Sequence, residues 1–200
     1  MLYYIFYLFK PLIWLIMRPK VHGNKRALNT KGGVIFICNH ISLMDPVILG
    51  VVSPRVIHFM AKKELFENKI ANALFRAAYA FPVDRGSADI KSIKSAIKVL
   101  EKGCAFGIFP EGRRMIADRM DEFEMGTSMI AMRSGVPVVP IYLDNHAYSR
   151  FRRNLIVGDP IYSKDSELPG VSRRENEKVF TQRIMNSMNS LKRELDSICG

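Results

Sequence analysis

Short apolar runs alternate with amphipathic stretches along most of this chain. The runs at residues 33–38, 55–61 and 104–109 are rich in β-branched or aromatic residues and have the length of buried strands. The stretches between them repeat apolar residues at helical spacing. This alternation is typical of α/β proteins, in which helices connect the strands of a parallel sheet. We therefore predict a single α/β domain with a mixed, mostly parallel sheet flanked by helices.

Capping residues and glycines mark the expected helix ends. Asp45 is expected as the N-cap of a helix whose first residue is Pro46. Residues 127–134 predict a short helix that Gly135 closes. The last predicted helix, at residues 172–198, opens with Ser and Glu three residues apart, the spacing of a capping box. Its apolar residues fall on one helical stripe: Phe180, Ile184, Met188, Leu191, Leu195 and Ile198.

Two proline-containing segments need separate interpretation. Residues 81–87 are expected to form a connection between elements. Residues 136–143 predict a strand. Because proline cannot donate a backbone hydrogen bond, we expect its prolines to lie near a sheet edge or at a strand end.

The first seventeen residues are apolar apart from Lys10, which Pro11 follows. As one helix they would extend about 25 Å, short of the hydrocarbon core of about 30 Å. A signal peptide would carry its charge before the apolar run and a small-residue cleavage site after it, and this segment has neither. Its aromatic residues and basic sequel predict a membrane-interfacial anchor at residues 1–20, ahead of a domain at 21–200. The alternative is a buried first helix of the domain.

The amino-acid composition limits the kinds of molecule that this chain is expected to bind. The chain has 200 residues and a formal net charge of +11, from 30 Lys and Arg against 19 Asp and Glu. This excess favours anionic partners: nucleic acid, an anionic membrane or a phosphorylated small molecule. Nucleic acid is disfavoured, because the basic residues are spread along the chain and the aromatic cluster lies in the apolar N-terminal segment. The three cysteines form neither a disulfide framework nor a zinc pattern, and we predict no metal site.

Polar residues follow the predicted strands. His40 comes after the strand at 33–38, and Arg85, Glu111, Arg113 and Arg114 follow later strand candidates. In open α/β sheets, ligands bind beyond the carboxyl ends of the strands. Each residue alone has an ordinary explanation: a strand-end histidine, a local ion pair with Asp84, or support of a turn. Together with the carboxylate of Asp45 they offer a base, an orienting acid and cations that fit a phosphate.

Four blocks of the chain resemble the glycerolipid acyltransferases, especially the 1-acyl-sn-glycerol-3-phosphate acyltransferases. The blocks are "NHISLMD" at 39–45, "FPVDR" at 81–85, "FPEGRR" at 109–114 and "VPVVPIYL" at 136–143. They stand in the family's order, and the resemblance extends from about residue 20 to about residue 160. The first block is the family's H-x(4)-D motif.

The resemblance implies transfer of an acyl chain from acyl-CoA or acyl-carrier protein to the hydroxyl of 1-acylglycerol 3-phosphate, giving phosphatidate, with no cofactor. His40 would be the general base and Asp45 would orient it. The acceptor would be held by Arg85, Glu111, Gly112, Arg113 and Arg114, with arginine forks on the phosphate.

One departure affects the acceptor. The family's third block usually reads F-P-E-G-T-R-S, so Arg113 and Met115 stand in place of threonine and serine. Glycerol 3-phosphate or another lysophospholipid therefore stays open as the acceptor. A non-catalytic membrane scaffold stays open as the alternative to an enzyme. Because the acceptor lives in the bilayer, we expect a monotopic membrane protein at the cytoplasmic face, the inner membrane if the source is bacterial.

Overall fold

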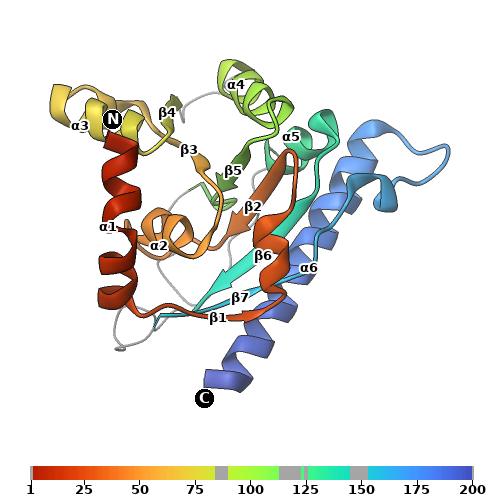
Figure 1. Ribbon diagram of the computed structural model, residues 1–200. Coiled ribbons are helices and arrows are strands. Elements are labelled where there is room, and N and C mark those ends of the chain that lie inside the picture. Colours follow the sequence, from red (N-terminus) through yellow and green to blue (C-terminus); the bar gives the residue numbers. More distant parts are fainter. Residues whose placement is uncertain (1, 84–89, 113–122, 124–125, 145–152, 200) are drawn as a thin grey trace.

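The structure is a computed structural model that describes residues 2–83, 90–112, 123, 126–144 and 153–199. Strands and helices alternate through most of this part of the chain (Figure 1). The helices are α1 (Leu2–Met17), α2 (Asp45–Val52), α3 (Lys69–Ala77), α4 (Ile90–Glu101), α5 (Gly126–Ser134) and α6 (Arg173–Cys199). The strands are β1 (Lys20–Gly23), β2 (Val34–Cys38), β3 (Ile57–Lys62), β4 (Ala80–Val83), β5 (Ala105–Ile108), β6 (Val138–Leu143) and β7 (Asn154–Val157). Short 3₁₀ helices are η1 (Lys25–Asn29), η2 (Lys63–Phe66) and η3 (Ser163–Ser166).

The described strands form one sheet in the order β1-β7-β6-β2-β5-β3-β4. The five strands from β6 to β4 all run parallel. β7 pairs antiparallel with β6, and β1 runs parallel to β7. The predicted α/β domain with a mixed, mostly parallel sheet is therefore confirmed.

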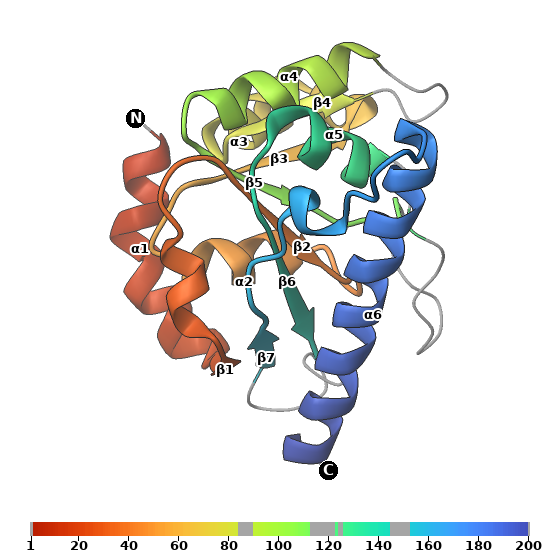
Figure 2. The same cartoon turned by 90° about the vertical axis from the view of Figure 1, so that its right-hand side faces the viewer.

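Helices cover both faces of the sheet, and the core has two layers. α1, α2 and α3 contribute to the apolar cluster on one face, and α4, α5 and α6 to the cluster on the other (Figure 2). The central strand β2 divides its side chains between them, with Phe36 in the first cluster and Ile35 and Ile37 in the second. All five residues of β2 are buried, because a strand covered on both faces has no side left for polar residues.

The predicted start of α6 and end of α5 are confirmed. The hydroxyl Oγ of Ser172 lies 2.6 Å from Oε2 of Glu175, and the backbone N–H of each residue donates to the side chain of the other. Gly135 closes α5 in the left-handed region, with a φ of +65°. The stripe on α6 is buried as far as Leu195, whereas Ile198 is 46% exposed.

The interpretation of the first proline segment was wrong, and that of the second was right about the strand but wrong about its place in the sheet. Residues 81–83, expected within a connection, belong to the edge strand β4, which begins at residue 80. The strand predicted at 136–143 is present as β6, but it lies inside the sheet between β7 and β2, and Pro140 is its third residue of six rather than a strand end. The carbonyl of Pro140 accepts a hydrogen bond from the N–H of Gly158, just after the end of β7. The N and O of one residue face the same side of a strand, so the nitrogen of Pro140 also faces Gly158. Because β7 ends at Val157, the N–H that proline lacks would lie beyond the end of β7.

Helix α1 packs on the domain along one side only. Met17 is 5% exposed and belongs to the first core cluster, and Ile13 packs against it. Between them and the start of the chain, Nζ of Lys10 donates to the carbonyl of Ser53 at 2.5 Å, and burial lowers the pKa of Lys10. The opposite side exposes apolar residues, so α1 is not the buried first helix of the alternative interpretation. In the part of the chain that the structure describes, no helix combines the length and apolar character needed to cross a bilayer.

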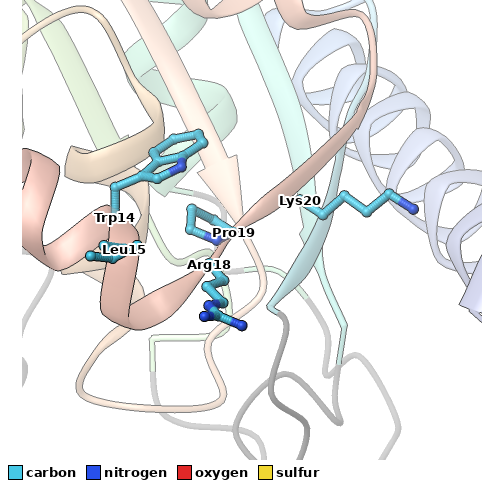
Figure 3. Close-up of a pocket in the computed structure, with 5 residues that line it drawn as sticks. All are labelled: Trp14, Leu15, Arg18, Pro19 and Lys20. Carbon is cyan, nitrogen blue, oxygen red and sulfur yellow. The ribbon is translucent and has the colours of Figure 1, made fainter.

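The end of α1 adjoins the first strand of the sheet. Trp14, Leu15, Arg18, Pro19 and Lys20 line a surface pocket there (Figure 3). The lysine side chain points away from the tryptophan, toward the other side of the strand. This end of α1 therefore combines an exposed indole with basic side chains.

Candidate active site

The first predicted block forms the turn from β2 into α2. β2 ends at Cys38, and the chain passes through residues 39–44 before α2 begins. Asp45 is the first residue of α2 and Met44 occupies the cap position, so the predicted N-cap was displaced by one residue. The carboxylate of Asp45 turns back toward the preceding loop, and its Oδ2 lies 2.7 Å from Nδ1 of His40.

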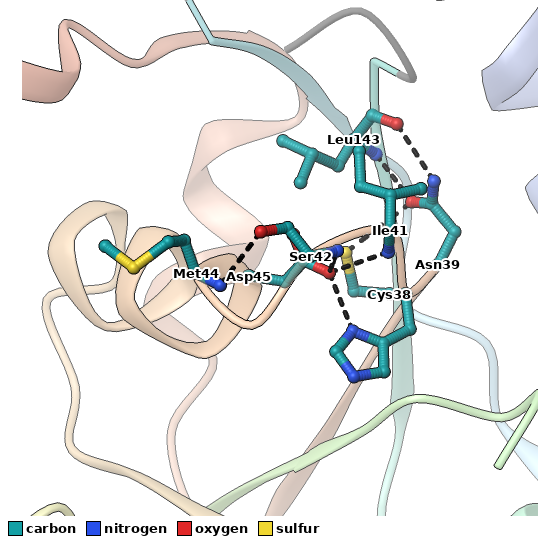
Figure 4. A network of polar contacts seen from close by, with 8 residues as sticks. Cys38, Asn39, Ile41, Ser42, Met44, Asp45 and Leu143 are labelled. Atoms are coloured by element: carbon teal, nitrogen blue, oxygen red, sulfur yellow. Dashed lines mark hydrogen bonds and ion pairs between the residues drawn. The ribbon is translucent and has the colours of Figure 1, made fainter. Parts of the chain in front are cut away.

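Oδ2 of Asp45 accepts two further hydrogen bonds, from the backbone N–H groups of Ile41 and Ser42, each 2.8 Å long (Figure 4). The Asp45 side chain is fully buried, with 0% exposure, whereas that of His40 is 13% exposed. A buried carboxylate is tolerated when donors surround it, and three donors on one oxygen also fix its position. Asp45 is therefore held rigidly against the imidazole.

The geometry assigns the histidine tautomer. A carboxylate can only accept hydrogen bonds, so in this pair the proton lies on Nδ1 of His40. The other ring nitrogen, Nε2, then carries the lone pair. A neutral imidazole with this tautomer can accept a proton from a bound hydroxyl, and the adjacent carboxylate favours the imidazolium that forms.

Aromatic stacking against one ring face holds the imidazole of His40 in place. The rings of His40 and Phe109 are stacked with centroids 4.3 Å apart, and Phe59 stacks behind Phe109 at 6.1 Å. Phe59 in turn lies over Gly107, where an added Cβ would stand 2.3 Å from the Phe59 ring. A glycine at this position of β5 is therefore needed for the ring stack that ends on His40.

Asn39 joins the ends of two strands and was not singled out by the sequence analysis. It is fully buried, its Oδ1 accepts the N–H of Leu143 at 2.7 Å, and its Nδ2 donates to the Leu143 carbonyl at 2.9 Å. The side-chain amide of Asn39 thus pairs with the backbone of Leu143 at the carboxyl end of β6, as a residue of a neighbouring strand would. An asparagine directly after a fully apolar strand was the available signal, since a buried amide needs partners for both of its polar atoms.

Glu111 and Gly112 lie after β5, the strand beside β2. Glu111 is 5% exposed, and Gly112 has a φ of +64°, a conformation that favours glycine. The sheet order therefore brings these two residues to the same edge as His40. Their assignment to acceptor binding remains a prediction.

Cys38 lies close to the pair but is no candidate nucleophile. Burial, followed by the negative charges of Asp45 and Glu111, raises the pKa of the Cys38 thiol well above its usual range. The thiolate, not the thiol, is the reactive form of cysteine. Cys38 therefore stays a protonated core residue.

The remaining predicted site residues, Arg85, Arg113 and Arg114, lie outside the described residues. Of the seven predicted site residues, the structure describes His40, Asp45, Glu111 and Gly112, and it gathers them at the carboxyl ends of β2 and β5. Within the described ranges, no group of three or more His, Cys, Asp or Glu side chains is arranged to hold a metal ion.

Comparison with known proteins identifies the family. The model of the acyltransferase family matches residues 18–144. A 1-acyl-sn-glycerol-3-phosphate acyltransferase of Bacillus subtilis is 33% identical over 182 residues, covering 88% of this chain and 89% of the relative. The protein of the same name from Streptococcus pneumoniae is 30% identical over 162 residues, covering 77% of this chain and 60% of the relative.

The fold is also found in a solved structure, that of the 1-acyl-sn-glycerophosphate acyltransferase of Thermotoga maritima. It aligns with a TM-score of 0.67 at 22% sequence identity and covers 95% of this chain and 80% of its own. At this identity the likeness shows a shared fold. The resemblance inferred from four sequence blocks is confirmed by the family model and by the Bacillus relative: the chain belongs to the acyltransferase family.

Proposed function

We propose that this acyltransferase moves an acyl chain from an acyl thioester to the free hydroxyl of 1-acylglycerol 3-phosphate, giving phosphatidate. The observation that carries the proposal is the hydrogen bond of 2.7 Å between His40 and Asp45, which leaves Nε2 of the imidazole as the basic atom. The names of the relatives from Bacillus and Streptococcus supply the acceptor.

In the proposed reaction the acceptor hydroxyl attacks the thioester carbonyl carbon directly. Nε2 of His40 takes the hydroxyl proton as the C–O bond forms, and Asp45 stabilises the resulting imidazolium through Nδ1. When the tetrahedral intermediate collapses, the C–S bond breaks and the imidazolium returns the proton to the departing thiolate. The histidine ends in its starting tautomer. Because the acceptor hydroxyl attacks the thioester directly, no protein nucleophile takes part. General base catalysis of this kind contributes roughly 10²–10⁴ in rate.

The acceptor phosphate is assigned to arginine. The resemblance assigns this role to Arg85 and Arg114, with Arg113 as an addition, and to Glu111 with Gly112 as further acceptor contacts. A guanidinium can bind two phosphate oxygens at once, which a lysine cannot reproduce. Replacing Arg85 or Arg114 by alanine should therefore lower kcat/KM for the acceptor by about one to two decades, with less effect on the acyl donor.

The proposed location is the cytoplasmic face of a membrane, with α1 lying in one leaflet. Leu8, Leu12, Leu15 and Ile16 on its outer side are each at least 50% exposed. Trp14 and Arg18 stand at its end, the combination of indole and cation that is enriched at membrane interfaces. In sealed vesicles, a protease added outside should reach the start of α1 and the domain alike, and protection of only one of them would refute this arrangement.

The decisive experiment uses purified protein in detergent with a panel of acceptors and donors. The panel contains 1-acylglycerol 3-phosphate, glycerol 3-phosphate and other lysophospholipids, each with acyl-CoA and with acyl-carrier protein. His40→Ala should lower the turnover by about 10²–10⁴ while the protein still unfolds cooperatively. His58→Gln, a substitution of a half-buried histidine on β3, is the matched control and should keep its turnover. A folded His40→Ala protein with near wild-type turnover would remove the proposed base.

A further inference from the structure

The exposed apolar side chains of the described chain are unevenly distributed. Sixteen large hydrophobic residues are exposed there, and eleven of them lie between residues 8 and 74. Six are on α1, two are in the loop before α2, one is on η2 and two are on α3. The other five are spread over α4, the segment around η3, and α6. Single exposed apolar residues are ordinary on a protein surface, but a cluster indicates a contact surface.

The elements that carry the eleven residues adjoin one another. α1 packs against both α2 and α3, and η2 packs against α3 (Figure 1). The rings of Phe66 on η2 and Phe75 on α3 lie 5.4 Å apart, and both pack on the first core cluster. All of these elements cover the same face of the sheet, the face toward which His40 stacks on Phe109.

Helix α3 is amphipathic, and part of its apolar side is uncovered. Phe75 faces the core, whereas Ile70 and Leu74, one turn apart, are 73% and 53% exposed. The polar side carries Asn72 and Arg76, joined by a hydrogen bond of 2.8 Å between Oδ1 and Nε. A surface helix of a water-soluble domain normally turns its apolar stripe inward. An outward apolar stripe on a short amphipathic helix is the pattern of an interfacial membrane contact.

The charges around α3 favour an anionic surface. Four exposed basic residues lie on α3 or in the segment just before it: Lys62, Lys63, Lys69 and Arg76. Two exposed acids, Glu64 and Glu67, stand among them, so the balance over residues 62–76 is positive. Long basic side chains can lay their methylene stems along an apolar surface while their charged ends reach the phosphate groups of a bilayer.

We propose that α3 is a second bilayer contact. Ile70 and Leu74 of α3, with Leu65 of η2 beside them, contact an anionic phospholipid surface. The outer side of α1 contacts the same surface. In this arrangement Leu43 and Met44, the exposed residues directly before Asp45, also contact the bilayer and bring the His40 turn to its surface. This inference rests on the proposed membrane association of α1 and adds a second, separate element to it.

Tryptophan fluorescence tests the two contacts separately, because Trp14 is the one tryptophan of the chain. The probe is a vesicle of phosphatidylglycerol and phosphatidylcholine with brominated acyl chains, which quench an indole that enters the hydrocarbon region. The wild-type protein reports α1. A variant with Trp14→Phe and Leu74→Trp reports α3, and one with Trp14→Phe and Val179→Trp, on the opposite helix layer, is the control.

We expect bromolipid quenching of the wild-type protein and of the Leu74→Trp variant, and none of the Val179→Trp variant. Quenching of Trp14 without quenching at position 74 would overturn the proposal while leaving the α1 anchor intact. Quenching at neither position would refute both. Shielding of the position-74 indole from aqueous iodide before any vesicle is added would show that a second copy of the chain covers α3, and this result would also overturn the proposal.

A binding measurement supplies the energetic test. Ile70→Ser with Leu74→Ser should weaken partitioning into the same vesicles by about ten- to a hundredfold, because two apolar side chains no longer leave water. Leu168→Ser with Val179→Ser removes two exposed apolar residues elsewhere and should leave partitioning unchanged. Equal partitioning of the two double variants would refute the contact at α3.

Discussion

Replacing Asp45 by asparagine separates the charge of this side chain from its shape. In the wild-type protein a single oxygen, Oδ2, accepts from Nδ1 of His40 and from the N–H groups of Ile41 and Ser42. An asparagine whose oxygen takes that place keeps all three acceptor contacts. The substitution Asp45→Asn therefore retains the turn and removes the negative charge beside the imidazolium.

The size of the effect follows from the distance. Two unit charges 2.7 Å apart attract by about 6 kcal/mol at an effective dielectric constant of about 20. If the proton is half transferred to the imidazole in the transition state, about 3 kcal/mol of this attraction is lost in the variant. At about 1.4 kcal/mol per factor of ten, the range from half to full transfer predicts a fall in kcat of about 10²–10⁴.

The assay is steady-state turnover of lysophosphatidate with acyl-CoA, together with denaturant unfolding of each variant. Asp165→Asn, an exposed site on η3, is the matched control and should change neither quantity. In a His40→Ala background, Asp45→Asn should lower turnover no further, since residues that act as a unit are not additive. Asp45→Asn with nearly full kcat would refute the reasoning and reduce Asp45 to a support of the turn.

Three further substitutions test the framework of the site. Asn39→Leu should lower the free energy of unfolding by about 2–4 kcal/mol, measured by urea titration, because the backbone N–H and carbonyl of Leu143 both lose the Asn39 side chain as their partner. Gly107→Ala should push Phe59 and cost both stability, by about 1–3 kcal/mol, and turnover, whereas Gly126→Ala, with open space at its Cβ, should cost neither. Burial lowers the pKa of His58, so its unfolded form binds more protons and stability falls as the pH drops below about 6.5; His58→Gln should weaken this dependence in unfolding titrations at pH 5 to 8.

The parts of the fold that could be predicted are those whose sequence pattern is local. β2, β3 and β5 are apolar runs at predicted positions, and α6 has both a capping box and a long stripe. β1, β4 and β7 are as short as β5 but contain lysine, proline or asparagine, so no apolar run marks them, and they gain their stability from pairing with strands distant in sequence. The place of β6 in the sheet was predicted wrongly, because the effect of Pro140 on strand pairing depends on where β7 ends. The sequence of β6 alone does not contain this information.

The site divides in the same way. His40 and Asp45 are five residues apart, and a strand-to-helix turn brings them together, so their contact could be predicted. The stacking of Phe109 and the pairing of Asn39 with Leu143 depend on β5 and β6 lying on either side of β2. Strand order is a property of the whole sheet, and no segment of the sequence shows it alone.

The short junction between α1 and the sheet limits how α1 can be removed or altered without damage to the fold. Residues 18 and 19 alone separate α1 from β1, and β1 pairs with β7 along its whole length. A truncation that reaches residue 23 would leave β7 as an unpaired edge, a template for aggregation. Removing α1 alone would still strip Met17 from the core. Polar substitutions at Leu12, Leu15 and Ile16 would instead change the outer side of the helix and keep its packed side, so they are the less damaging way to make α1 polar.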